Sequence, residues 1–181
     1  MRTTQPVSER NTSARSLAPL PVSATVFTVA VLLHNGDHLR RGVGSVGADV
    51  FWLGVFGIAL EVAVVVLVFM NHPTAPLAAV SAGVGLAAGY LFVHFTPSRT
   101  WLSDSFTSGS PSALSVLAAG FETVAALLLA AAGLSVIRRR GLASAAGGES
   151  TSTITATLRH PVVAAIVGGN LLILLATAVT R

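Results

Sequence analysis

The hydrophobic and polar positions of this chain alternate in long blocks, a pattern that predicts membrane-spanning helices. Five apolar runs are predicted to form the spans, at residues 17–38, 50–70, 77–95, 111–137 and 161–180. A helix needs about 20 apolar residues to cross the hydrocarbon core of a bilayer. The densest part of the first run, residues 22–33, is shorter, but Pro21 near the first helical turn and a polar end at the interface still allow a crossing. A cleaved signal peptide is the competing interpretation of this run, because a basic start precedes a short apolar core.

The segments outside these runs are polar and lack apolar periodicity. Residues 1–16 are predicted to be a disordered cytoplasmic tail. Residues 138–160 start with three arginines and continue in Gly, Ala, Ser and Thr, so they are predicted to be a flexible cytoplasmic loop. Residues 17–181 are predicted to form one all-α membrane domain, a polytopic bundle of about five transmembrane helices.

The composition supports a lipid environment. Of the 181 residues, 52% are hydrophobic and only 10% are charged, whereas soluble domains carry roughly 25% charged residues. The chain has no cysteine, which excludes disulfides, thiolate metal ligands and cysteine nucleophiles. No basic stripe interleaved with aromatic residues is present, which argues against nucleic acid as a partner.

The arginines give the predicted orientation of the bundle, because cytoplasmic loops of membrane proteins carry an excess of Lys and Arg. With five spans, seven arginines fall on the side of the N-terminus and four on the other side, the latter being Arg40, Arg41, Arg99 and Arg181. This distribution predicts a cytoplasmic N-terminus, an outer C-terminus and multi-pass residence in the cell membrane.

A polar stretch at residues 34–42, which reads HNGDHLRRG, directly follows the first apolar run. His34, Asp37 and His38 are spaced i, i+3 and i+4, so they share one face if the helix continues through them. Two imidazoles and a carboxylate suit a divalent metal ion such as Zn, Ni, Co, Mn or Fe. The alternative is a polar cap at the membrane interface, in which Asp37 pairs with Arg40 or Arg41.

Four further ionisable residues are predicted to approach this stretch from the same outer side. His94 ends the third run and Asp104 lies in the loop beyond it, so both are candidate metal ligands. Glu61 and Glu122 lie about 17 Å inside the second and fourth spans at 1.5 Å per residue. Charge at that depth is costly, so these two carboxyls should face the bundle interior, paired or protonated. They are predicted to act with Arg41 as relay or counter-charge groups, or else to form hydrogen bonds between helices.

These residues predict an outward-facing cavity that binds or passes a cation, either a divalent metal ion or a proton. Five helices are few for a monomeric transporter, so this function predicts a homo-oligomer. The alternative from another class is a membrane subunit or scaffold, with the small-residue stripe Ser81, Gly85 and Gly89 docking a partner helix.

An enzyme is less well supported by the sequence. Ser103 or Ser105, with Asp104 and His94, contains the residue types of a hydrolase, but no nucleophile-elbow pattern is present. A metal-dependent intramembrane hydrolase and a haem held between His38 and His94 are further alternatives.

Two stretches carry a resemblance to a known family. LLHNGDHLRRG at residues 32–42 and GYLFVHFTPSRTWLSDSF at residues 89–106 resemble a family of small, uncharacterised integral membrane proteins of high-GC Gram-positive bacteria. The resemblance implies residence in the membrane and brings no activity with it. The Asp-His pair preceded by another His is also similar in chemistry to nickel/cobalt permeases, although the spacing is shorter here and the other permease motifs are absent.

Overall fold

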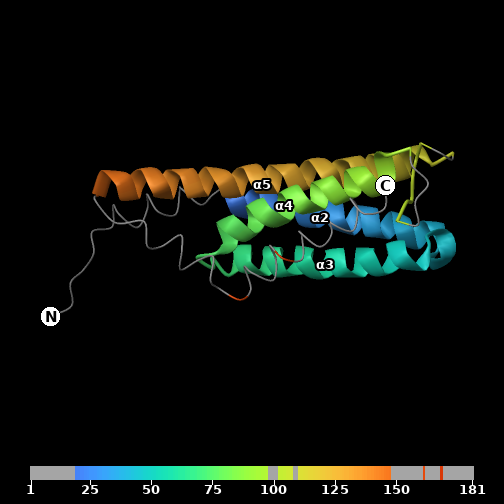
Figure 1. Ribbon diagram of the computed structural model, residues 1–181, viewed down its shortest axis with the longest axis horizontal. Helices are drawn as coiled ribbons and strands as arrows, with labels where there is room; N and C mark the ends of the chain where they lie inside the picture. Colours follow the sequence, from blue (N-terminus) through green and yellow to red (C-terminus); the bar gives the residue numbers. More distant parts are fainter. Residues whose placement is uncertain (1–18, 98–101, 108–109, 148–160, 162–167, 169–181) are drawn as a thin grey trace.

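The computed structural model describes residues 19–97, 102–107 and 110–147, together with residues 161 and 168. The described chain is all-helical (Figure 1) and consists of α2 (Pro19–Arg41), the short 3-10 helix η1 (Val43–Ser45), α3 (Ala48–Phe69), α4 (Ala75–Phe95) and α5 (Ala113–Gly147). The four α-helices are each long and apolar enough to cross a membrane. The all-α class and four of the predicted spans are therefore confirmed as helices. The predicted tail at residues 1–16 lies outside the described residues, as does nearly all of the predicted fifth span at residues 161–180.

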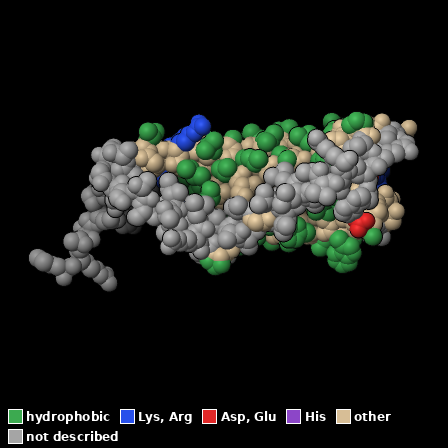
Figure 2. Space-filling view, viewed as in Figure 1, with side chains coloured by type: hydrophobic (Ala, Val, Ile, Leu, Met, Phe, Trp, Pro, Cys, Tyr) green, Lys and Arg blue, Asp and Glu red, His purple; other side chains and the backbone are tan. Residues whose placement is uncertain are grey.

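Large apolar side chains on the outside of the four helices agree with a membrane environment. Trp52, Val62 and Phe69 of α3 are exposed, as are Leu32 of α2 and Leu117 of α5. Hydrophobic side chains lie along the length of the face shown in Figure 2. Monomeric soluble proteins seldom expose apolar surface so extensively, whereas lipid chains solvate it without cost.

Helices α4 and α5 make the closest contact in the bundle, and glycine allows it. A Cβ atom on Gly83 of α4 would lie only 2.4 Å from the backbone oxygen of Ala126, and one on Gly133 of α5 would lie 2.5 Å from the oxygen of Pro76. The interface around them is formed by small buried residues such as Ala79. These contacts hold α4 and α5 as the rigid pair against which α2 packs.

The turn between α2 and α3 depends on one glycine. Gly42 follows the last residue of α2 with φ of +92°, a backbone conformation that glycine adopts without a steric penalty. Its N–H donates to the oxygen of Leu39. The polar stretch at residues 34–42 is thus the last two turns of α2 and its terminating glycine, as the spacing predicted.

Helix α5 differs at both ends from the predicted span at residues 111–137. It begins at Ala113, where Ser112 Oγ accepts a hydrogen bond from the N–H of Ser115, an N-capping arrangement. It continues through Arg140 to Gly147, into the segment predicted to be a flexible loop. Arg, Leu and Ala are good helix formers and no proline occurs between Arg138 and Gly147, so the helix continues past the arginines.

Residues 102–107 fold back over the C-terminal end of α4. The N–H groups of Asp104 and Phe106 donate to the backbone oxygens of Val93 and His94. This loop therefore lies at the same end of the bundle as the C-terminus of α2 and the N-terminus of α5 (Figure 1).

Candidate metal centre and its polar network

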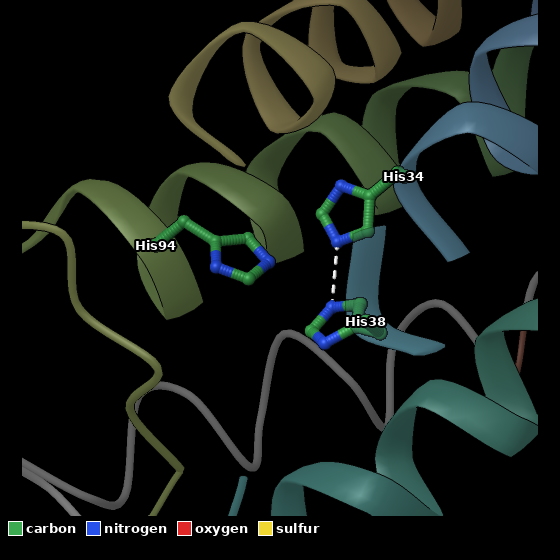
Figure 3. Close-up of side chains that lie close together, drawn as sticks. All are labelled: His34, His38 and His94. Carbon is green, nitrogen blue, oxygen red and sulfur yellow. Dashed lines mark hydrogen bonds between the residues drawn. The ribbon is translucent and has the colours of Figure 1, made fainter. Parts of the chain in front are cut away.

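Three histidines from two helices converge at this end of the bundle. His34 and His38 lie one turn apart on α2, and His94 lies near the end of α4. One ring nitrogen from each lies within 4.8 Å of the others, and Nε2 of His34 is 2.8 Å from Nε2 of His38 (Figure 3). His34 and His94 are buried. Such a group could hold a metal ion.

The remaining ring nitrogens of His34 and His94 both face oxygen atoms. Nδ1 of His34 lies 2.9 Å from Oε2 of Glu122 on α5, although the two atoms are out of line for a hydrogen bond. Nδ1 of His94 is 3.2 Å from the backbone oxygen of Asp104 and donates to it. Histidines that bind metals usually turn their second nitrogen to a carboxylate or a backbone carbonyl, because this leaves the first nitrogen free as a ligand.

His38 is held differently. Its Nδ1 lies 2.8 Å from a guanidinium nitrogen of Arg41. Arginine has only donors, so Nδ1 of His38 must accept and its proton must lie on Nε2. In this arrangement Nε2 of His38 donates to Nε2 of His34. A metal ion would take the place of this hydrogen bond, and Arg41 would have to leave Nδ1 of His38.

The two candidate carboxylates of the sequence prediction are both paired with arginines, and Oδ2 of Asp104 also lies 3.6 Å from Nδ1 of His94. Arg41 donates to both carboxylate oxygens of Asp104, at 3.2 Å and 2.7 Å. Arg40 donates to Oδ1 of Asp37 from Nε at 2.9 Å and from a terminal nitrogen at 2.7 Å, and Nε of Arg41 lies 3.2 Å from Oδ2 of Asp37. The pairing of Asp37 with Arg40 and Arg41, which was part of the alternative weighed for Asp37, is therefore present in the structure.

Asp104 is the charged group of this network that lies outside the helices. Burial raises the pKa of its carboxyl, but the hydrogen bond and the positive charge of Arg41 outweigh burial, so the pKa lies below the ordinary value of 3.8. Asp104 is therefore ionised at neutral pH and fixes Arg41, which also contacts His38.

Deeper in the bundle, Tyr90 links the two glutamates. Its hydroxyl donates a short hydrogen bond to Oε1 of Glu61 and lies 3.1 Å from Oε1 of Glu122. Both carboxyls are buried. A phenol carries one hydrogen, so both contacts are hydrogen bonds at the same time only when one carboxyl carries a proton. The sequence prediction that Glu61 and Glu122 face the bundle interior agrees with this geometry.

Tyr90 is a member of this polar network that the sequence prediction missed. It is the only tyrosine in the chain, and it lies one turn before His94 on α4, so the i, i+4 spacing could have placed it on the same face. Through Tyr90 and Glu122, a line of polar contacts connects Glu61 in the middle of α3 with the histidines at the end of the bundle.

A cavity of about 360 Å³ adjoins both groups. Its polar lining includes His34, His38, His94, Glu61, Tyr90 and Glu122. Much of its apolar lining comes from α3, including Val50, Leu53 and Ile58. The predicted cavity with His and Glu residues in its wall is thus present, although Asp37 and Asp104 are not part of the wall.

A nucleophilic Ser103 and a haem find no support in the geometry, whereas the metal-dependent hydrolase stays a prediction. The hydroxyl of Ser103 is buried without a hydrogen-bond partner in the described chain, so it lacks the base that a nucleophilic serine needs. The rings of His38 and His94 both lie against His34, with centroid distances of 4.7 Å and 4.9 Å, which leaves no room for a haem between them.

The small-residue stripe predicted for helix packing lies on α4. Gly85 and Gly89 are buried within the molecule and Ser81 is half-buried. The close approach of α4 to α5 uses Gly83 instead. Docking of a partner helix on the stripe stays a prediction.

Comparison with known proteins yields no relative. The chain matches no protein family, and no curated protein or solved structure matches it.

Proposed function

We propose that this membrane protein binds one divalent transition metal ion through Nε2 of His34, His38 and His94. The convergence of the three imidazoles in a buried position, with the second nitrogens of His34 and His94 turned to oxygen atoms, is the observation that carries this proposal. Isolated buried histidines are not normally arranged in this way, whereas metal ligands are.

The distances in the structure are close to those of a metal site. Zinc binds imidazole nitrogens at about 2.0–2.1 Å in tetrahedral geometry, which places ligand nitrogens about 3.3 Å apart. The nitrogens of the histidine cluster are 2.8 Å apart at the closest and lie within 4.8 Å of one another.

The donor set favours particular ions. Three neutral imidazoles without thiolates suit Zn, Co, Ni or Cu, and they suit Mg or Ca poorly because those ions prefer oxygen ligands. A divalent ion inside a bilayer also needs negative charge nearby. Glu122 behind His34 and Glu61 beyond Tyr90 are placed to give that charge.

Passage of the ion across the membrane is the further part of this proposal. The histidine cluster lies at the end of the bundle, while Glu61 and Glu122 lie deeper along the same cavity wall. A cation could therefore move from the imidazoles to the carboxyls along one wall. Transport also calls for an oligomer or a partner subunit, since four or five helices enclose little space.

The direct test is elemental analysis of the purified full-length protein after metal supplementation. We expect one metal ion per chain in the wild type and none in the double variant His34→Ala/His38→Ala. The matched control is His72→Ala, because His72 lies in the turn at the other end of α3 and outside the cavity. Equal metal contents in the wild type and the double variant would overturn the proposal.

A further inference from the structure

The cavity beside the histidines has a mixed lining. His34, His38 and His94 all line it. The residues that α3 contributes are apolar or glycine, such as Leu53, Gly54 and Gly57, with Glu61 as the exception. The cavity also reaches Ser45 and Val46 in the connection between α2 and α3, outside the helices long enough to cross a membrane.

A metal ion held by three histidines has a fourth coordination position that a non-protein ligand can occupy. Structural zinc sites have four protein ligands, whereas sites that bind or convert a substrate have three and leave the fourth position open. Asp37 and Asp104, the carboxylates nearest in sequence, are already engaged by arginines. Since the three histidines share the cavity wall, the open position of the ion faces the cavity.

The size and lining of the cavity indicate what fills that position. A volume of about 360 Å³ is in the range of small-molecule sites, roughly 300–1,000 Å³. Water finds hydrogen bonds at the polar residues but is poorly held against Val50, Leu53 and Ile58, which offer it none. A molecule with one metal-binding end and one apolar end would suit both parts of the lining.

We infer that the cavity binds an amphipathic small molecule, whose anionic oxygen head coordinates the metal ion and whose hydrocarbon tail packs against α3. This inference rests on the proposed metal site. An anionic oxygen head complements the ion because the three histidine ligands are neutral. The cavity extends to Ser45 and Val46, outside the helices long enough to cross a membrane, so a molecule dissolved in the membrane surface would reach the ion from that end.

The test uses full-length protein in lipid nanodiscs, loaded with Co²⁺ and titrated with alkyl hydroxamates of increasing chain length. Cobalt reports its ligands by visible absorption. We expect each hydroxamate to shift the cobalt bands, with binding that tightens about fourfold per added methylene until the cavity is full. Gly57→Leu fills the apolar end of the cavity, since a Cβ there meets only Leu86 at 3.9 Å. Gly57→Leu should leave cobalt bound but abolish the increase of hydroxamate affinity with chain length.

Two further measurements keep the outcome clear. Gly120→Leu is the matched control, because a Cβ on Gly120 of α5 meets nothing within 4 Å and Gly120 is outside the cavity wall; it should bind hydroxamates as the wild type does. Gly54→Leu offers a second cavity-filling variant if Gly57→Leu fails to fold. Stoichiometric cobalt whose bands ignore hydroxamates, or affinities that do not depend on chain length, would overturn the inference and leave the metal site standing. A protein that retains no cobalt would overturn both.

Discussion

His34 and Glu122 face each other across the contact between α2 and α5, with Nδ1 of the imidazole 2.9 Å from Oε2 of the carboxyl. Both side chains are buried, and within the described chain neither of these two atoms has a hydrogen-bond partner. A carboxylate behind an imidazole increases its basicity and keeps its far nitrogen free for a metal ion. This relationship connects the histidine cluster with the glutamates deeper in the bundle.

Glu122→Gln should weaken metal binding by about 10- to 100-fold, because loss of the carboxylate behind a metal-binding histidine has an effect of that size. The dissociation constant for Co²⁺ or Zn²⁺, measured by competition with a chelator, checks this. Glu61→Gln removes the same charge from a residue that contacts Tyr90 instead of His34. It should weaken metal binding clearly less than Glu122→Gln does. Equal losses in both variants would show that only the overall charge matters.

Arg41→Gln should tighten metal binding. The arginine places a positive charge and a donor against Nδ1 of His38, whereas the glutamine amide offers an oxygen that can accept the Nδ1 proton of a metal-bound imidazole. Chelator competition on the two proteins measures the effect. Arg40→Gln is the control, because Arg40 bonds to Asp37 and Ser112 and not to the histidines. Weaker binding in Arg41→Gln alone would mean that Arg41 supports the site instead of competing with the ion.

Tyr90→Phe should lower the free energy of unfolding by about 1–3 kcal/mol, because it takes the hydroxyl away from two buried carboxyls. Equilibrium unfolding in mixed micelles gives the value. The double variant Tyr90→Phe/Glu61→Gln should recover part of the loss, since one carboxyl becomes a neutral amide that can itself donate. No recovery would indicate that the phenol acts through packing.

The ion pair of Asp104 with Arg41 should make stability depend on acidity. The folded pKa of Asp104 lies below its unfolded value, so the contribution of the pair is complete above the unfolded pKa and is lost as the pH falls through the lower, folded pKa. The difference in thermal midpoint between wild type and Asp104→Asn should therefore be constant between about pH 5 and pH 7 and shrink below about pH 4. A difference that grew on acidification would contradict this assignment.

Gly83→Ala should destabilise the bundle by about 1–3 kcal/mol, the usual range for overpacking. The added Cβ would meet the backbone oxygen of Ala126 at 2.4 Å, so α4 and α5 would have to separate. Gly120→Ala adds the same atom where nothing lies within 4 Å and should be neutral or slightly stabilising. Thermal unfolding of the two variants side by side measures both effects.

The sequence predicted the helices well because apolar runs of this length have few alternatives. The spans at residues 50–70 and 77–95 differ from α3 and α4 by about two residues at most. The end of α5 could not be predicted in the same way, since Arg138 to Arg140 mark the membrane interface but do not stop a helix. The change from apolar to charged residues indicates where a membrane span ends. The end of the helix itself is indicated only by glycine, proline or a capping residue.

The site was predictable in part. The i, i+4 spacing of His34 and His38 follows from helix geometry, and His94 was placed at the same end of the bundle by counting spans. The sequence could not show that Asp37 turns to Arg40, nor that Asp104 binds Arg41 63 residues away, because a carboxylate near both arginines and histidines has two good partners. Tyr90 was missed because a single tyrosine in an apolar helix carries no pattern of its own.

The most direct test of the metal site is X-ray absorption spectroscopy of the protein loaded with Zn²⁺ or Co²⁺. The account predicts three imidazole nitrogens at about 2.0–2.1 Å from the ion and one non-protein oxygen ligand in the remaining position. A shell made only of oxygen atoms, or a spectrum unchanged in His34→Ala/His38→Ala, would show that the ion lies elsewhere and that the three histidines do not bind it.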